Sequence, residues 1–163
     1  MHKTGVDGEN ITALMRELES QTELLAGRLS DTLLIITADH GHINCRNKVI
    51  TDYPDICRCL VRMLSMEPRA LNLFVKEGME QEFEQAFEKH FSDSFLLVPR
   101  EKVLSENLLG TGNDHPKLEK MLGDYIAVAT GDIFITNTAD KGLGAHAGIT
   151  EEEMTIPLIA VKL

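Results

Sequence analysis

The chain has 163 residues, of which 43% are hydrophobic and 26% are charged, a balance typical of one soluble globular domain. Its formal net charge of −10 disfavours binding to nucleic acid backbones and to anionic membranes, because both carry negative charge. No apolar run approaches the roughly 20 residues of a transmembrane helix, so we expect no membrane contact.

An amphipathic helix is predicted over residues 8–29, with Asp7 as its N-cap. Residues 32–38 follow, and they are apolar on both faces and rich in β-branched side chains. This pattern is typical of a central strand in a parallel sheet. We expect the helix to pack on a face of that sheet, and the C-terminal strand at residues 155–161 to belong to the same sheet.

From about residue 52 the sequence predicts a series of short helices and strands. A short helix starting near Pro54, a strand at 70–75, an acidic helix and a strand at 95–98 follow one another. The acidic helix has Met79, Phe83, Phe87 and His90 on one stripe, and residues 106–116 have a loop composition. We interpret residues 52–123 as an inserted α+β lobe between two core segments, 1–51 and 124–163.

The last core segment contains two strands, at residues 125–130 and 133–136, on either side of Gly131–Asp132. A Gly-Asp pair between two such strands indicates a β-hairpin. Thr150 and Glu153 have the spacing of a capping box that opens a very short helix before the final strand. The predicted fold class is therefore α/β: a partial core sheet with helices, interrupted by the small lobe.

Two histidine-containing segments point to chemistry. Asp39 and His40 come directly after the most apolar strand, where ligands gather in open α/β sheets, and Gly41 lets the chain bend so that both side chains reach one metal ion. Asp and His are ordinary ligands of zinc and manganese. The alternative is that Asp39 caps a turn and that His40 and His42 are polar loop residues.

His146 lies among small residues in the segment Gly142–Gly148, where the backbone could approach a ligand closely. A lone histidine in such a loop is usually without function, and His2 taken alone is a weaker signal still. The three cysteines, Cys45, Cys57 and Cys59, form no CxxC pair, so we interpret them as free thiols and expect a reducing, cytoplasmic location.

Three segments together resemble one family. The run DTLLIITADHGH, residues 31–42, resembles the strand and Asp-His-Gly metal motif of the alkaline phosphatase superfamily. The run GAHAGITEEEMTIPLIAV, residues 144–161, resembles its closing motif, and MHKTG, residues 1–5, resembles the tail of its Asp-x-x-x-His motif. The chain looks most like the C-terminal portion of a type I phosphodiesterase/nucleotide pyrophosphatase, with the strongest likeness over residues 1–45 and 142–163.

The resemblance implies an alkaline-phosphatase-like core and a phosphoric-ester hydrolase with two divalent metal ions, zinc first and manganese second. Asp39 and His40 would bind one ion and His2 and His146 the other, while His42 would border a small phosphorylated substrate. The family's Thr or Ser nucleophile, and two further aspartates, would precede Met1 in a missing N-terminal segment that acts as the partner of this chain. The chain alone is therefore expected to contain no catalytic nucleophile and to be inactive.

Four alternatives remain open, and one of them is a globular domain with no relation to metals, which requires all three motif matches to be accidental. A phosphoglycerate-mutase-like enzyme shares the Asp-His-Gly, but there the motif usually continues with Asn-Ala-Glu, whereas His42-Ile43-Asn44 follows here. A sulfatase would use calcium and a modified residue that also lies outside the chain. The alternative from another functional class is a non-catalytic domain kept for binding or assembly.

Overall fold

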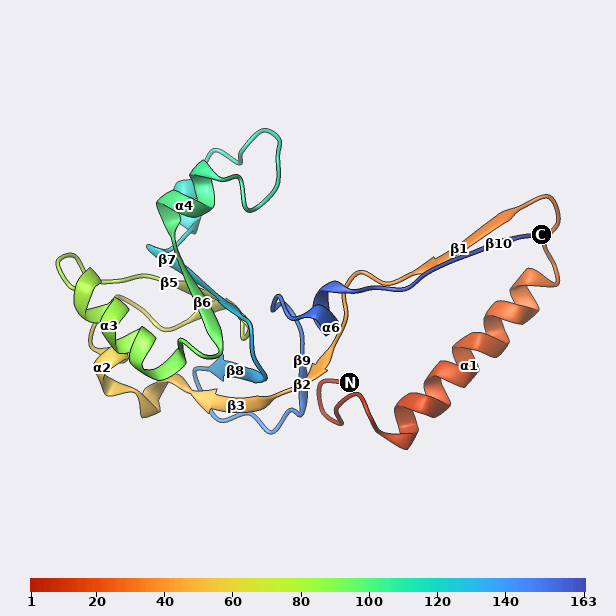
Figure 1. Cartoon of the computed structure of the whole chain (residues 1–163), viewed down its shortest axis with the longest axis horizontal. Coiled ribbons are helices and arrows are strands. Elements are labelled where there is room, and N and C mark those ends of the chain that lie inside the picture. Colours follow the sequence, from red (N-terminus) through yellow and green to blue (C-terminus); the bar gives the residue numbers. More distant parts are fainter.

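The computed structural model describes all 163 residues, and it separates into a packed lobe and a thin extension (Figure 1). The lobe contains most of the helices and strands. The extension consists of α1 (Glu9–Ala26), β1 (Leu33–Thr37) and β10 (Leu158–Lys162). Between the two lie the N-terminus, the short strands β2 (Ile43–Asn44) and β9 (Gly144–Ala145), and the helix α6 (Glu151–Met154).

The lobe is built on an antiparallel four-stranded sheet in the order β4-β5-β7-β6. Its strands are Ser65–Glu67, Ala70–Leu73, Tyr125–Ala129 and Phe95–Pro99 respectively. Helix α3 (Glu80–Phe91) buries Phe83, Phe87 and Phe91 in the main hydrophobic core, as its predicted apolar stripe requires. Shorter helices η1 (Ile50–Asp52), α2 (Pro54–Cys57), α4 (Arg100–Ser105) and α5 (Leu118–Met121) surround the sheet.

The hairpin predicted around Gly131–Asp132 is wrong. Strand β7 pairs with β5 and β6 inside the lobe, whereas β8 (Ile133–Thr136) pairs in parallel with β3 (Arg46–Val49). The turn directs the chain from one sheet to the other, since Asp132 accepts two hydrogen bonds from the side chain of Arg46 and one from its backbone N–H. Strand β7 therefore belongs with the lobe's sheet, and the division into residues 1–51, 52–123 and 124–163 otherwise stays a prediction.

Strands β1 and β10 lie in one sheet, as expected, but this sheet has only these two strands and they are antiparallel. The expectation of a central parallel strand is therefore wrong for this chain. Each strand keeps one unpaired edge, and all five residues of β10 are exposed. One apolar face of β1, with Leu33 and Ile35, is exposed, and the other, with Leu34 and Ile36, is only partly covered.

Helix α1 also differs from expectation. It buries none of its residues, so the prediction that it packs on the sheet is wrong. Gly8, without a side-chain cap, occupies the N-cap position, while the carboxylate of Asp7 instead accepts a 2.6 Å hydrogen bond from Asn44. An apolar stripe indicates that a helix has a face to bury, but it does not say whether the covering surface lies in the same chain.

No helix combines the length and the apolar character that a membrane span requires.

Candidate metal centre

Four histidines from three separate segments meet where the lobe and the extension join. The rings of His40 and His146 stack, with centroids 4.0 Å apart and planes 12° apart. The ring of His2 lies 5.2 Å from that of His146 and 4.6 Å from that of His42. The predicted meeting of His40 with His146, with His2 beside them, is confirmed, while the role of these residues as metal ligands stays a prediction.

Local backbone pairing brings the three segments together. The antiparallel pair β2–β9 places the segment after His42 beside the segment before His146. The backbone carbonyl of His2 accepts hydrogen bonds from the N–H groups of Leu143 and Gly144, at 2.8 and 3.1 Å, and this fixes the N-terminus beside β9. Gly41 is needed for close approach, because a Cβ there would lie 1.8 Å from the carbonyl oxygen of Glu152.

Hydrogen bonds to the backbone orient two of the rings. The Nδ1 atom of His40 lies 2.7 Å from the carbonyl oxygen of Gly41, and the Nδ1 atom of His2 lies 3.2 Å from that of Gly144. Since a carbonyl only accepts, each Nδ1 carries the proton, and each Nε2 of the neutral ring keeps a free lone pair. Metal-binding histidines are typically held in this way.

Asp39 and His40 present their donor atoms to the same side. The Oδ2 of Asp39 lies 3.7 Å from the Nε2 of His40. Two ligands of a tetrahedral zinc ion, with bonds of about 2.0–2.2 Å, lie about 3.4 Å apart, so the pair needs only a small adjustment. The side chain of Asp39 is 89% exposed, so its carboxylate can reorient.

His42 occupies the inner side of the cluster. Its Nε2 is buried and has no hydrogen-bond partner. Burial, together with the neighbouring His2 and His146, lowers the pKa of His42. The pKa of His146 is likewise lowered by burial and by His40 and His2. These surroundings therefore favour the neutral imidazole at His42 and His146, the form that binds metal ions.

No group of three or more His, Cys, Asp or Glu side chains in the chain is arranged to hold a metal ion. The ligand pairs that the resemblance implies, Asp39 with His40 and His2 with His146, stay a prediction. Such pairs fit part of a metal coordination sphere, which in catalytic zinc sites normally includes three protein ligands.

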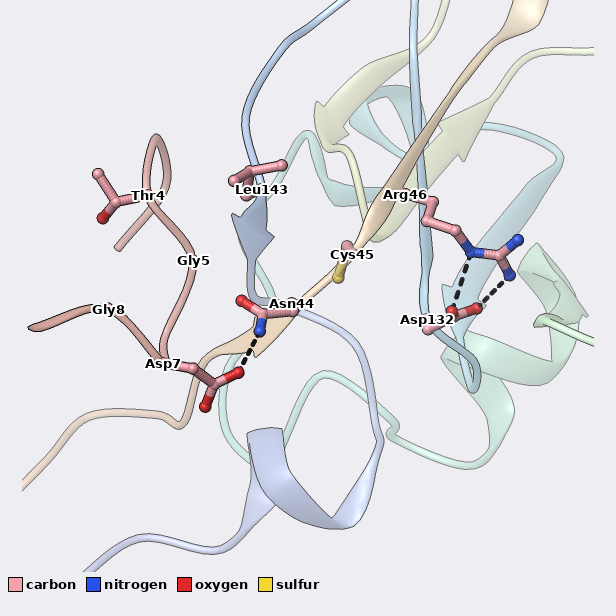
Figure 2. A pocket seen from close by; sticks show the side chains of 9 residues that line it. All are labelled: Thr4, Gly5, Asp7, Gly8, Asn44, Cys45, Arg46, Asp132 and Leu143. Carbon is pink, nitrogen blue, oxygen red and sulfur yellow. Dashed lines mark hydrogen bonds and ion pairs between the residues drawn. The ribbon is translucent and has the colours of Figure 1, made fainter.

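One of the cavities borders two of the clustered histidines. This cavity of about 250 Å³ has His2 and His146 in its wall, together with Lys3, Glu67 and Asp140, which the sequence interpretation missed. A larger one, of about 500 Å³, contains none of the predicted ligands (Figure 2). In it Asn44 donates a hydrogen bond to Asp7, and the charge of Arg46 is paired with that of Asp132.

The sequence also gave no signal for Arg69, which is fully buried and paired with Glu153 below the His146 loop. The capping box of Thr150 and Glu153 was predicted and is confirmed. Its partner Arg69 stands in a different region of the sequence, and nothing in the local pattern marks it. The three cysteines are free thiols, as expected.

No protein-family model matches the chain, and no curated protein matches it. Among solved structures, the chain superposes on murine ectonucleotide pyrophosphatase/phosphodiesterase 5 with a TM-score of 0.73 at 20% identity, covering 99% of this chain and 44% of that one. The human protein gives a TM-score of 0.70 at 20% identity, covering 99% and 43%. Phosphonoacetate hydrolase from Sinorhizobium meliloti, in complex with phosphonoformate, gives 0.69 at 17% identity, again covering 99% and 43%.

The chain spans less than half the length of these neighbours. At these identities the likeness concerns the fold. The resemblance expected from the three motifs is confirmed at that level: this chain has the α/β fold of one part of the alkaline-phosphatase-like phosphodiesterases and hydrolases.

Proposed function

We propose that the chain provides part of the metal-binding site of a two-metal phosphoric-ester hydrolase. Asp39 and His40 hold one divalent ion, His2 and His146 hold the other, and His42 borders the substrate. The observation that carries the proposal is the convergence of His2 and His40 on His146 from the other end of the chain, with ring centroids 5.2 and 4.0 Å from that of His146. Zinc is the first candidate and manganese the second, because imidazole and carboxylate suit both.

Bound divalent ions would neutralise the phosphate oxygens during displacement. The residues of this chain would hold the ions and orient the phosphate group between them. The carbonyl groups of Gly41 and Gly144 fix the tautomers of His40 and His2, so that Nε2 of each ring is available. The cavity beside His2 and His146 has room for a small phosphorylated group, and Lys3 in its wall is a cation suited to a phosphate oxygen.

The neighbours support a small phosphorylated substrate. One murine structure is an inactive threonine-to-alanine variant in complex with AMP, and the bacterial hydrolase was determined with phosphonoformate and with phosphonoacetate. In this proposal the threonine or serine nucleophile lies outside these 163 residues. The three free thiols support a reducing compartment, and we propose the cytoplasm.

A site-resolved metal titration tests the proposal. The histidine ring signals of the 163-residue chain are followed by NMR while zinc is added. The signals of His2, His40 and His146 should shift or broaden together, and those of His90 and His115, which lie outside the cluster, should not. His146→Ala should abolish the response of His2, whereas the matched variant His115→Ala should leave it unchanged. Equal responses at all histidines, or none at the cluster, would refute the metal site.

A non-catalytic assembly domain is the second candidate, and one observation favours it. Large apolar side chains of the extension are exposed, with Leu33 at 62%, Leu158 at 76% and Leu24 at 55% exposure. A two-stranded sheet with two unpaired edges is marginally stable in water and suited to adding a strand. A chain that forms a stable complex through this surface but shows no response to zinc would favour this second candidate.

A further inference from the structure

The loops that carry the two proposed metal pairs are joined by one residue, Glu153. Its backbone carbonyl accepts a 2.8 Å hydrogen bond from the N–H of Gly41, the residue after His40. Its side chain accepts a 2.8 Å bond from the N–H of Gly148, two residues after His146. It also accepts a 2.8 Å bond from the hydroxyl of Thr150.

Glu153 is in turn held by Arg69 from the lobe. The Nε and Nη2 atoms of Arg69 each donate a 2.6 Å hydrogen bond to one carboxylate oxygen, and the third contact, from Nη1, reaches the carbonyl oxygen of Ile133 at 2.7 Å. The side chains of Arg69 and Glu153 are 0% and 1% exposed. A two-point contact of this kind fixes orientation as well as distance.

A backbone hydrogen bond also ties Arg69 to strand β7 of the lobe. The carbonyl oxygen of Arg69 accepts the N–H of Ala129, and the carbonyl of Ala129 accepts the N–H of Ile149 in the loop after His146. The lobe therefore supports the His146 loop at two places, through the backbone at Ile149 and through the ion pair at Glu153. The Asp39–His40 segment has only the contact with Glu153 among these supports.

We propose that Arg69 and Glu153 are positioning residues that set the separation of His40 and His146, and through it the spacing of the two metal-binding pairs. Neither residue touches the proposed metal ions. The inference rests on the proposed function for the metal, but the geometric part, the control of the His40–His146 stack, stands apart from it. Outer-shell partners of this kind typically change metal affinity about 10- to 100-fold.

The test compares two double variants of the 163-residue chain. Arg69→Met with Glu153→Met removes both buried charges together, so no unpaired charge is left behind. Arg46→Met with Asp132→Met removes an exposed ion pair, 70% and 59% exposed, whose side chains hydrogen-bond to each other and not to Glu153. The readouts are the nuclear Overhauser effect (NOE) between the His40 and His146 rings in metal-free protein, and the zinc affinity of the cluster.

The first double variant should lose the His40–His146 NOE and at least tenfold in zinc affinity, while the NOE between Phe83 and Tyr125, whose rings lie 5.2 Å apart in the lobe, persists. The second double variant should keep the His40–His146 NOE, the zinc affinity and the Phe83–Tyr125 NOE of the wild type. If the wild-type chain shows the histidine NOE and the first variant loses it, but zinc binds to neither, the positioning inference stands and the proposed function fails. A histidine NOE that survives in the folded first variant overturns the inference.

Arg69→Lys covers the case in which the first double variant does not fold. It keeps the buried positive charge opposite Glu153 but replaces the planar fork with a single point of contact. The inference expects a weaker His40–His146 NOE and reduced zinc affinity, with the lobe signal intact. An NOE and an affinity equal to those of the wild type would overturn it.

Discussion

The ring of His40 lies stacked on the ring of His146, although one follows β1 near the start of the chain and the other follows β9 near its end. This face-to-face contact disfavours a state in which both imidazoles are positively charged, because two cationic rings at 4.0 Å repel each other. The lowered pKa of His146, caused by burial and by His40 and His2, agrees with this geometry.

Acidification should therefore destabilise the chain. In the unfolded chain these histidines titrate near their ordinary value of about 6.5, whereas in the folded chain the pKa values of His42 and His146 are lower. Below about pH 6.5 the unfolded state binds more protons, so stability is full above that value and is lost as pH falls through the folded-state pKa values. Urea unfolding between pH 8 and pH 5 measures this. His146→Gln should give a shallower pH dependence, and an unchanged slope would contradict the expectation.

The isolated chain should show no metal-dependent turnover of activated phosphomonoesters or phosphodiesters. Each proposed ion has two protein ligands, one fewer than in a typical catalytic zinc site. The cavity beside His2 and His146 contains no serine or threonine that could act as nucleophile. Assays with zinc and with manganese measure the turnover. Activity that disappears in Asp39→Ala would show that these 163 residues contain a working site.

Some local structural features could be predicted from the sequence alone. The stripe of Phe83 and Phe87 on α3 and the capping box at Thr150 were predicted, because each depends on periodicity or on a short motif. The meeting of His40 with His146 followed from the resemblance rather than from spacing. Distances along the chain contain no information on which loops meet.

The wrong prediction for β1 and the missed Arg69 have different physical causes. Strand β1 was expected in a covered parallel sheet because both its faces are apolar, yet Leu33 is 62% and Ile35 is 55% exposed. Apolar patterning reports a need for burial, and it does not identify the covering surface. Arg69 was missed because nothing in its local sequence marks it as buried. A buried arginine leaves no periodic signal, and its partner Glu153 lies in a distant part of the sequence.

Breaking the Arg69–Glu153 pair should be costly when one partner is removed and less so when both are. Arg69→Met or Glu153→Met alone leaves a buried charge unpaired and should cost about 3–5 kcal/mol. The double variant should cost less than either single variant, although Gly148 loses its acceptor. Urea unfolding of the four proteins gives the coupling free energy. Simple additivity of the two single effects would contradict a directly coupled pair.

Substitution of one glycine tests the packing of the same loop. A Cβ on Gly148 would lie 2.5 Å from a carboxylate oxygen of Glu153, 2.6 Å from Nη2 of Arg69 and 2.8 Å from the carbonyl oxygen of Ala129. None of these three groups can move away without losing contacts. The carboxylate of Glu153 and the guanidinium of Arg69 are bonded to each other, and the carbonyl of Ala129 belongs to β7. Gly148→Ala should therefore destabilise the chain by about 1–3 kcal/mol, the range for overpacking a filled site.

The matched control for Gly148→Ala is Gly8→Ala. Gly8 has no atom within 4 Å of its Cβ position, and it stands at the N-cap of α1, where alanine costs less than about 1 kcal/mol. Both variants are compared by urea unfolding and by the NOE between the His40 and His146 rings. Gly148→Ala should weaken that NOE, because the carboxylate that supports both loops must move, while Gly8→Ala should leave it unchanged. If Gly148→Ala lowers stability no more than Gly8→Ala, the loop around His146 is not held at Glu153 as tightly as these contacts require.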